Sequence, residues 1–241
     1  MIPYWMSRTQ LMLGDEQVGK LMRKNVLIIG LGGVGGICAE MIVRAGIGKL
    51  TIVDNDTIDA SNINRQIPAL HSTIKKSKAQ VLAARLLDIN PLVELTILEV
   101  FVENESMIAL IEKEHWHYVV DCIDTLSAKV DLIKGCMDRK LNIVSSMGAG
   151  GKLDPSQIKV TDLSKTYECN LARYVRKRLQ ALGIKKGLKV VFSSEKPDQS
   201  RIIETENAYP KKSIIGTLSY MPAIFGCTVA SVVIRDLMAI D

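Results

Sequence analysis

The sequence predicts one α/β domain built on a Rossmann-like, mostly parallel sheet with helices on both faces. Short apolar runs alternate with helical patterns between residues 25 and 146, and the first run leads directly into a glycine-rich turn. The chain has 241 residues, of which 47% are hydrophobic and 24% are charged. This usage is ordinary for a globular protein and excludes disordered, collagen-like and low-complexity chains.

Apolar runs predict the strands of the first half of the chain. The run at residues 25–30 is continuously apolar, which suits a strand that is buried on both faces of a parallel sheet. Further strands are expected at residues 49–54, 92–98, 118–122 and 142–146. Helical patterns predict the intervening helices at residues 33–45, 76–89, 106–114 and 126–139. This order predicts parallel strands joined by right-handed crossovers.

The pattern changes after the glycine-rich residues 148–151. Strands are expected at residues 158–161 and 189–194, on either side of a basic helix, and the polar residues 195–212 predict a mobile crossover loop. We interpret residues 1–241 as one domain. Its nucleotide-binding half is expected at about residues 20–150. The second half, at about residues 151–241, is expected to bind substrate, to contain the crossover loop and to form the dimer contacts.

An uncharged run of 21 residues, 214–234, is long enough on paper to span a bilayer. Several polar residues and Pro222 interrupt it, so we expect a buried helix that starts near Pro222 and packs in the core or at a subunit interface. The N-terminal residues show no basic segment followed by an apolar one, and no signal peptide is expected. Together these features predict a cytoplasmic protein without membrane association.

The five cysteines are scattered along the chain, and no two form a C-x-x-C pair. This spacing argues against a disulfide framework and against a structural zinc site, and it favours a reducing compartment. Most of the cysteines fall within predicted strands or helices as small packing groups. Cys169 lies in a region expected to be mobile, and a role as a thioester-forming nucleophile stays open for it.

A glycine-rich turn, made by Gly30, Gly32, Gly33 and Gly35, follows the first strand and opens the first helix. Such a turn brings the backbone close to phosphate, which the N–H groups of the helix N-terminus then bind. Asp54 ends the next strand, where it is placed to bind ribose hydroxyl groups. The pattern fits NAD, FAD and ATP alike.

Polar residues farther along the chain favour ATP. Arg65 and Lys78 lie 13 residues apart and, with two asparagines, would converge on the phosphate-binding turn, as a triphosphate requires. Asp124 follows the fourth strand and is a candidate ligand for Mg²⁺. Taken singly, Lys78 could be a solvated lysine and Asp124 a helix N-cap. The predicted ATP-binding residues are Gly30, Gly32, Gly33, Gly35, Asp54, Asp56, Asn62, Asn64, Arg65, Gln66, Lys78, Asp124 and Lys129.

These motifs resemble those of the ubiquitin-activating-enzyme superfamily and its ThiF-type adenylyltransferases. The matching segments are GLGGVG at 30–35, TIVDND at 51–56, SNINRQ at 61–66, KKSKAQ at 75–80 and DCIDTLSAK at 121–129. The resemblance implies a dimeric enzyme that adenylates a carboxylate. It assigns Asp54 to ribose, Arg65 and Lys78 to phosphates, and Asp124 to the metal. Arg8 resembles the arginine that reaches the phosphates of the partner subunit, so the implied catalytic residues are Arg65, Lys78, Asp124 and Arg8.

Residues 146–166 and 191–197 look more narrowly like the tRNA threonylcarbamoyladenosine dehydratase branch. The sulfur-carrier activators of the superfamily typically carry two C-x-x-C zinc pairs, which this sequence lacks. The resemblance implies ATP-dependent cyclisation of threonylcarbamoyladenosine in tRNA. The carboxylate is adenylated, and the carbamoyl group of the same side chain closes a ring and expels AMP. Because closure is intramolecular, no protein nucleophile is required.

Two other functions stay open. One is an adenylyltransferase that activates a ubiquitin-like sulfur-carrier protein with a C-terminal Gly-Gly. The other is an NAD-type dehydrogenase or a nucleotide-sensing protein, which would bind NAD(H) tightly and release no pyrophosphate. The expected cofactors are ATP and Mg²⁺, without zinc. The partners considered are tRNA, a second copy of the chain, and an accessory protein such as a sulfur-transfer protein.

Residues 169–194 carry seven basic residues and no acidic one. The whole chain has a net charge of +5, so the remainder carries a net charge of −2. Apolar residues at helical spacing predict the packed face of a helix here, namely Leu171, Val175, Leu179 and Leu182. The basic residues are then expected on the other faces, which are either simply solvated or bind a polyanion. The candidate tRNA contacts are Arg173, Arg176, Lys177 and Lys185.

Overall fold

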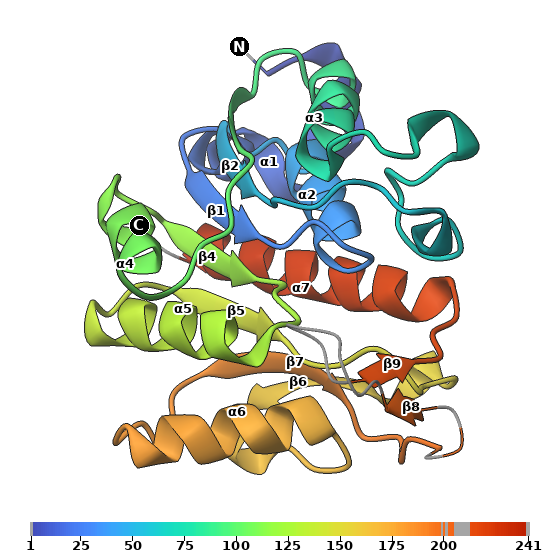
Figure 1. The fold of residues 1–241 in the computed structure, drawn as a ribbon. Coiled ribbons are helices and arrows are strands. Elements are labelled where there is room, and N and C mark those ends of the chain that lie inside the picture. Colours follow the sequence, from blue (N-terminus) through green and yellow to red (C-terminus); the bar gives the residue numbers. More distant parts are fainter. Residues whose placement is uncertain (1, 199, 201, 205–212, 240–241) are drawn as a thin grey trace.

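A seven-stranded sheet forms the centre of the part of the chain that the structure describes, residues 2–198, 200, 202–204 and 213–239 (Figure 1). In this computed structural model the strand order is β3-β2-β1-β4-β5-β7-β6. Every neighbouring pair is parallel except β6 with β7, so β6 is an antiparallel edge strand. The predicted Rossmann-like, mostly parallel sheet is confirmed. The strands are β1 (Asn25–Ile29), β2 (Lys49–Val53), β3 (Glu94–Leu98), β4 (Tyr118–Asp121), β5 (Ile143–Ser146), β6 (Ile158–Asp162) and β7 (Lys189–Ser193).

Helices cover both faces of the sheet and bury a separate cluster of apolar side chains on each (Figure 1). One cluster lies under α1, α2, α3 and α7, and the other under α4, α5 and α6. The helices are α1 (Ser7–Leu21), α2 (Gly35–Arg44), α3 (Lys78–Ile89), α4 (Asn104–Glu112), α5 (Leu126–Asp138), α6 (Asn170–Ala181) and α7 (Tyr220–Ala239). Short 3₁₀ turns occur at Tyr4–Met6, Ala60–Asn62, His71–Thr73, Pro155–Gln157 and Leu163–Lys165.

Helix α7 contains most of the uncharged run of the sequence, and one face of it belongs to the core. Gly226 lies so close to α2 that a Cβ atom on it would be 2.5 Å from the carbonyl oxygen of Val34. Near its end, Asp236 accepts hydrogen bonds from the Tyr118 hydroxyl and the Lys189 ammonium, both at 2.6 Å. Among the described residues, α7 is the one helix long and apolar enough to cross a membrane. The expected buried helix is confirmed, and it starts at Tyr220, two residues before Pro222.

Helix α1 is not predicted by any pattern in the sequence. Its apolar side chains are not buried together, since Leu11 and Met12 are exposed while Val18 and Leu21 are buried. Gly14 interrupts the helix with φ 78° and ψ 164°, so two short helical pieces meet there. Packing against α7 and the sheet, rather than local periodicity, stabilises such a helix.

The expected crossover loop at residues 195–212 contains a strand. β8 (Ile202–Glu204) pairs in antiparallel register with β9 (Ser213–Ile215), so the prediction of irregular structure is wrong for residues 202–204. The apolar part of this stretch is too short to signal a strand on its own. Residues 199, 201 and 205–212 lie outside the described part of the chain, and the mobility of the loop stays a prediction.

The contact between α2 and α7 gives a stability prediction. Gly226→Ala should lower the free energy of unfolding by about 1–3 kcal/mol, because its new Cβ meets the backbone oxygen of Val34. Gly19→Ala in α1 is the matched control, since a Cβ there meets only the end of the Arg23 side chain at 3.5 Å. This control should gain up to about 1 kcal/mol from helix propensity. Urea unfolding of both variants measures the difference, and an equal effect of the two changes would contradict close packing at Gly226.

Candidate nucleotide-binding site

The turn between β1 and α2 approaches its neighbours so closely that two of its residues must be glycine. Gly30 has a φ of 89°, and a Cβ atom on it would lie 2.6 Å from the carbonyl oxygen of Cys122. A Cβ atom on Gly35 would lie 1.8 Å from the carbonyl oxygen of Gly30. These contacts hold the N-terminus of α2 at the carboxyl edge of the sheet, and no described side chain caps it. The N–H groups at such a helix end are ready ligands for phosphate.

Gly33 and Gly32 have different surroundings. Gly33 packs against the start of α7, where a Cβ atom would lie 2.8 Å from the Cβ of Pro222. On Gly32, a Cβ atom would meet nothing closer than Nε2 of Gln66, at 3.8 Å. The fold therefore leaves room for a side chain at Gly32, and glycine there keeps the backbone open to the close approach of a ligand. Oε1 of Gln66 is buried without a hydrogen-bond partner among the described residues, so it also suits a donor on a ligand.

Asp54 is bound to the glycine-rich turn. It follows β2, and its carboxylate accepts hydrogen bonds from the N–H of Leu31 at 2.6 Å and the N–H of Asp56 at 2.8 Å. Burial raises the pKa of this carboxyl above its ordinary value, although the two backbone hydrogen bonds partly offset that effect. The structure therefore brings the predicted ribose ligand to the phosphate-binding turn, as expected from the sequence.

Lys78 is buried at the start of α3. The alternative interpretation, that Lys78 is only a solvated helix residue, is therefore wrong. Its ammonium donates to the Asp56 carboxylate at 2.7 Å, and the Asp56 side chain is 57% exposed. A buried cation whose acidic partner faces solvent can exchange that partner for the phosphates of a ligand. Lys78 and Asp56, both predicted as ATP-binding residues, are thus found together.

The loop at residues 61–66 presents Arg65 and uses its neighbours to hold it. One guanidinium nitrogen, Nη1, donates to the carbonyl oxygen of Ser61 at 2.7 Å and to Oδ1 of Asn64 at 2.8 Å. Nδ2 of Asn64 donates to the carbonyl oxygen of Thr217 at 3.0 Å, just before α7. Asn62 is buried, and its Oδ1 accepts from the Asp59 N–H at 3.2 Å. The two predicted asparagines therefore orient this loop and hold the Arg65 side chain.

Asp124 and Lys129 behave differently from each other. Asp124 is exposed between β4 and α5, at the carboxyl edge where its role was predicted. Lys129 is fully buried, and its ammonium donates to Asp121 Oδ2 at 2.6 Å, Ser145 Oγ at 3.1 Å and the Ser146 carbonyl at 3.0 Å. All three N–H groups of the ammonium are thus used inside the protein. The prediction that Lys129 contacts ATP is wrong.

Two apolar residues beside this edge were missed by the sequence analysis. Val100 and Phe101 follow β3 and are each nearly half exposed. Their loop lies next to Asp54, whose N–H donates to the carbonyl oxygen of Leu98 at 3.1 Å. Exposed apolar surface beside a ribose-binding carboxylate suits a purine ring. The sequence feature that could have indicated them is a pair of apolar residues just after the end of a strand, between acidic residues.

Helix α6 presents only part of the expected basic surface. Its buried stripe is Ala172, Val175 and Leu179, whereas Leu182 lies beyond the helix end and is 49% exposed. The predicted packed face is confirmed for Val175 and Leu179 and for Leu171, which is partly buried against the same cluster, and it is wrong for Leu182. The exposed basic candidates are Arg173, Lys177 and Lys185. Lys185 lies just before β7, at the amino edge of the sheet, while α6 begins beside Gly148 at the carboxyl edge.

Arg176 does not belong to this exposed set. Its Nη1 donates to the carbonyl oxygen and the hydroxyl of Thr166, at 2.8 and 2.7 Å, so it stabilises the turn that precedes α6. Its prediction as a tRNA contact is corrected, because its guanidinium packs inward. Arg178 was left out of the predicted set, yet its Nη1 donates to Ser127 Oγ at 3.1 Å. That hydrogen bond places a basic residue of α6 beside the start of α5, next to the Asp124 loop.

No cysteine thiol is hydrogen-bonded to the described residues of this site. All five are free, and Cys169 is buried in the core beneath α6, contrary to its expected position in a mobile region. Within the described residues, no group of three or more His, Cys, Asp or Glu side chains is placed to hold a metal ion. Arg8 is exposed in the first turn of α1, and in the described part of the chain no hydrogen bond or ion pair links it to Asp54 or Lys78.

Comparison with known proteins agrees with this geometry. The model of the ThiF family matches residues 7–240. The chain belongs to the ThiF family. A Bacillus subtilis relative, a tRNA threonylcarbamoyladenosine dehydratase, is 36% identical over 239 residues, which cover 96% of this chain and 94% of the relative. The Escherichia coli ThiS adenylyltransferase is 34% identical over 136 residues, 56% of this chain and 53% of its own length.

A solved structure of another ThiF-family relative matches the whole fold. The Escherichia coli tRNA threonylcarbamoyladenosine dehydratase TcdA, crystallised with ATP, superposes with a TM-score of 0.87 at 34% identity. The match covers 97% of this chain and 93% of that one.

The two kinds of glycine in the turn should respond differently to alanine. Gly32→Ala should leave the thermal midpoint near that of the wild type but weaken ATP binding, because its Cβ fits the fold and obstructs only the ligand. Gly35→Ala should lower the thermal midpoint as well, since its Cβ would overlap the carbonyl oxygen of Gly30. Differential scanning fluorimetry with and without ATP measures both quantities. Unchanged ATP binding by Gly32→Ala would contradict the placement of phosphate at this turn.

Proposed function

We propose that this chain is an ATP-dependent enzyme that cyclises threonylcarbamoyladenosine in tRNA. One observation carries the proposal: the similarity to the Bacillus subtilis dehydratase extends over 96% of this chain and 94% of that relative. The similarity to a sulfur-carrier adenylyltransferase covers only 56% of the chain. Adenylation is therefore common to both candidate functions, whereas the remainder of the chain favours a tRNA substrate over a sulfur-carrier protein.

Residues at the carboxyl edge divide the work of adenylation. Asp54 binds the ribose hydroxyl groups, and the turn at Gly32 with the N-terminus of α2 holds phosphates. Arg65 and Lys78 stabilise the negative charge that develops as the substrate carboxylate attacks the α-phosphorus and pyrophosphate leaves. Because Lys78 is already paired with Asp56, the phosphates replace an existing anionic partner instead of binding an empty site.

The Asp124 carboxylate suits Mg²⁺. Magnesium is usually held by one or two protein carboxylates, with phosphate oxygens and water as its other ligands, and one exposed aspartate at the phosphate edge meets that need. When bound with ATP, Mg²⁺ would neutralise part of the negative charge of the phosphates.

Ring closure needs no nucleophile from the protein. The carbamoyl group attacks the adenylated carbonyl carbon, the bond from that carbon to AMP breaks, and the carbamoyl group loses a proton. Both reacting groups belong to one side chain, so effective molarity supplies much of the rate. The burial of Cys169 in the core supports this route over a thioester intermediate.

We further propose that the enzyme is a cytoplasmic homodimer. Around Arg8, large apolar side chains are exposed, namely Tyr4 (92%) in the 3₁₀ turn before α1 and Leu11 (81%) and Met12 (83%) in α1. A second copy that covers this surface would bring Arg8 to the phosphates of its partner. The placement of α7 in the core supports a protein outside the membrane, and an accessory sulfur-transfer protein stays a prediction.

The tRNA surface is proposed on the exposed side of α6. Arg173 and Lys177 lie on it, and Arg178 reaches the start of α5 next to Asp124. The helix is about 18 Å long, so it can carry the phosphates of several nucleotides while one nucleotide enters the site. Lys185 extends this basic surface toward the amino edge.

The proposed activity is tested with ATP, Mg²⁺ and tRNA that carries threonylcarbamoyladenosine. The wild type should release pyrophosphate and AMP, and mass spectrometry of the nucleosides should show loss of one water. Lys78→Ala should cost about 1.5–3 kcal/mol of nucleotide or transition-state binding, because it removes one charge-assisted hydrogen bond. Lys76→Ala, an exposed lysine two residues away, is the control and should have little effect. Tight binding of NADH without ATP, or activity only with a sulfur-carrier protein, would refute the proposal.

Salt dependence tests the proposed tRNA surface. Arg173→Gln/Lys177→Gln should weaken tRNA binding and reduce the slope of log affinity against log salt by up to about 0.9 for each phosphate that is no longer neutralised. ATP affinity should not change, since neither residue lies in the nucleotide site. Lys113→Gln/Lys140→Gln removes the same charge from the amino edge and should change the slope much less. Equal slopes for the two double variants would show that α6 is merely solvated.

A further inference from the structure

We propose that the buried ion pair between Asp121 and Lys129 is a positioning device that fixes the turn carrying Asp124. The inference rests on the proposed function, because it gives Asp124 a task at the phosphate edge. It assigns neither Asp121 nor Lys129 a contact with substrate or nucleotide. Instead, the pair sets where the Asp124 backbone lies relative to the sheet.

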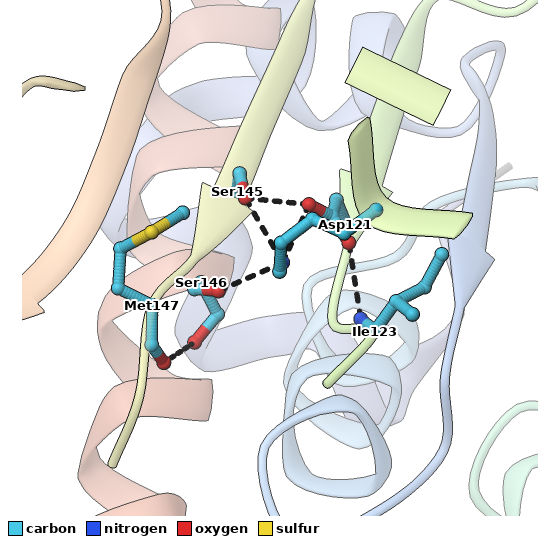
Figure 2. Close-up of polar contacts among 6 residues, drawn as sticks. Asp121, Ile123, Ser145, Ser146 and Met147 are labelled. Carbon is cyan, nitrogen blue, oxygen red and sulfur yellow. Dashed lines mark hydrogen bonds and ion pairs between the residues drawn. The ribbon is translucent and has the colours of Figure 1, made fainter. Parts of the chain in front are cut away.

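The pair is sealed and fully hydrogen-bonded. Both side chains are 0% exposed, and Lys129 Nζ lies 2.6 Å from Asp121 Oδ2. Ser145 completes the network, since its hydroxyl donates to Asp121 Oδ2 and accepts from the Lys129 ammonium. Figure 2 shows Asp121 facing Ser145 on the neighbouring strand, with Ile123 bound on its other side. No polar group of the pair is left for a ligand.

The same two residues hold both ends of the turn. On the strand side, the free oxygen of Asp121, Oδ1, accepts from the N–H of Ile123 at 3.0 Å. On the helix side, the Lys129 ammonium donates to the carbonyl oxygen of Ser146 on β5 at 3.0 Å and so ties the first turn of α5 to the sheet. The backbone N–H of Lys129 donates to the carbonyl oxygen of Thr125 at 3.0 Å, which is the ordinary helical hydrogen bond of that turn. Asp124 is the residue between Ile123 and Thr125. The pair therefore holds the segment before Asp124 through Ile123 and ties the helix that follows it to the sheet through the Lys129 ammonium.

Stability alone does not account for this pair. Moving two charges out of water is costly, and apolar side chains of similar volume often stabilise a core as well or better. The core on this face of the sheet is apolar, with Val119, Ile143 and Cys136 in the buried cluster under α5. Apolar residues in place of the pair would fill the volume but would leave the N–H of Ile123 without its acceptor. We therefore attribute to the Asp121–Lys129 pair the positioning of the backbone at Asp124, rather than a gain in stability.

Two uncharged double variants separate geometry from stability. Asp121→Asn/Lys129→Met and Asp121→Leu/Lys129→Met both remove the ion pair, and only the first keeps an acceptor for the N–H of Ile123. Both should fold, by thermal unfolding and circular dichroism. Amide hydrogen exchange at residues 122–125 should stay close to wild type in the asparagine variant and become faster in the leucine variant. If the leucine variant does not fold, Asp121→Ala/Lys129→Met removes the same acceptor from a smaller side chain and takes its place.

Calorimetric titration with ATP gives the second readout. The leucine variant should lose about tenfold or more in Mg²⁺-dependent ATP affinity, as is usual when the support of a metal ligand is removed. The asparagine variant should lose less, and ATP affinity without Mg²⁺ should be similar in both. Equal exchange at residues 122–125 in the two variants, or equal losses of affinity, would overturn the inference. Absence of Mg²⁺-dependent ATP binding in the wild type would instead refute the proposed function, and hydrogen exchange would still decide the role of the pair.

Discussion

The approach of Gly35 to the carbonyl oxygen of Gly30 is the contact on which the rest of the site depends. Because the backbone is this close, α2 must begin directly at the carboxyl edge of the sheet. Three other segments then meet the same turn: Asp54 binds the N–H of Leu31, the carbonyl of Arg65 lies against Gly33, and α7 packs on both glycine and helix. Fold and nucleotide site are therefore consequences of one steric constraint.

Two lysines of this edge show how burial of the anionic partner decides what a buried cation can do. Lys78 is paired with Asp56, which faces solvent, so water or phosphate can compete for the ammonium. Lys129 is paired with Asp121 in a network where both partners are sealed, so nothing outside the protein can compete. The first lysine is suited to bind a ligand and the second to hold a backbone.

The strands and the identity of the functional edge could be predicted from the sequence, for physical reasons. Parallel strands buried on both faces leave continuous apolar runs, and the close backbone packing at Gly30 and Gly35 requires glycine at those two positions of the turn. The sequence does not show which of its charged side chains are buried. The side chains of Lys129 and Arg176 carry the same charge as solvated ones, and only packing turns them inward. Helix α1 was missed for the same reason, since distant contacts stabilise it.

The seating of α7 on the phosphate-binding turn has a consequence for synthesis of the chain. Pro222 covers Gly33 and Gly226 covers Val34, so the turn acquires its neighbours from a helix that is translated after every strand of the seven-stranded sheet. During translation the sheet can assemble from segments that have already emerged, while the turn still lacks one wall. The turn is therefore complete only once α7 has been made and has packed, and any stabilisation of the folded protein by a nucleotide bound at this turn depends on α7 as well.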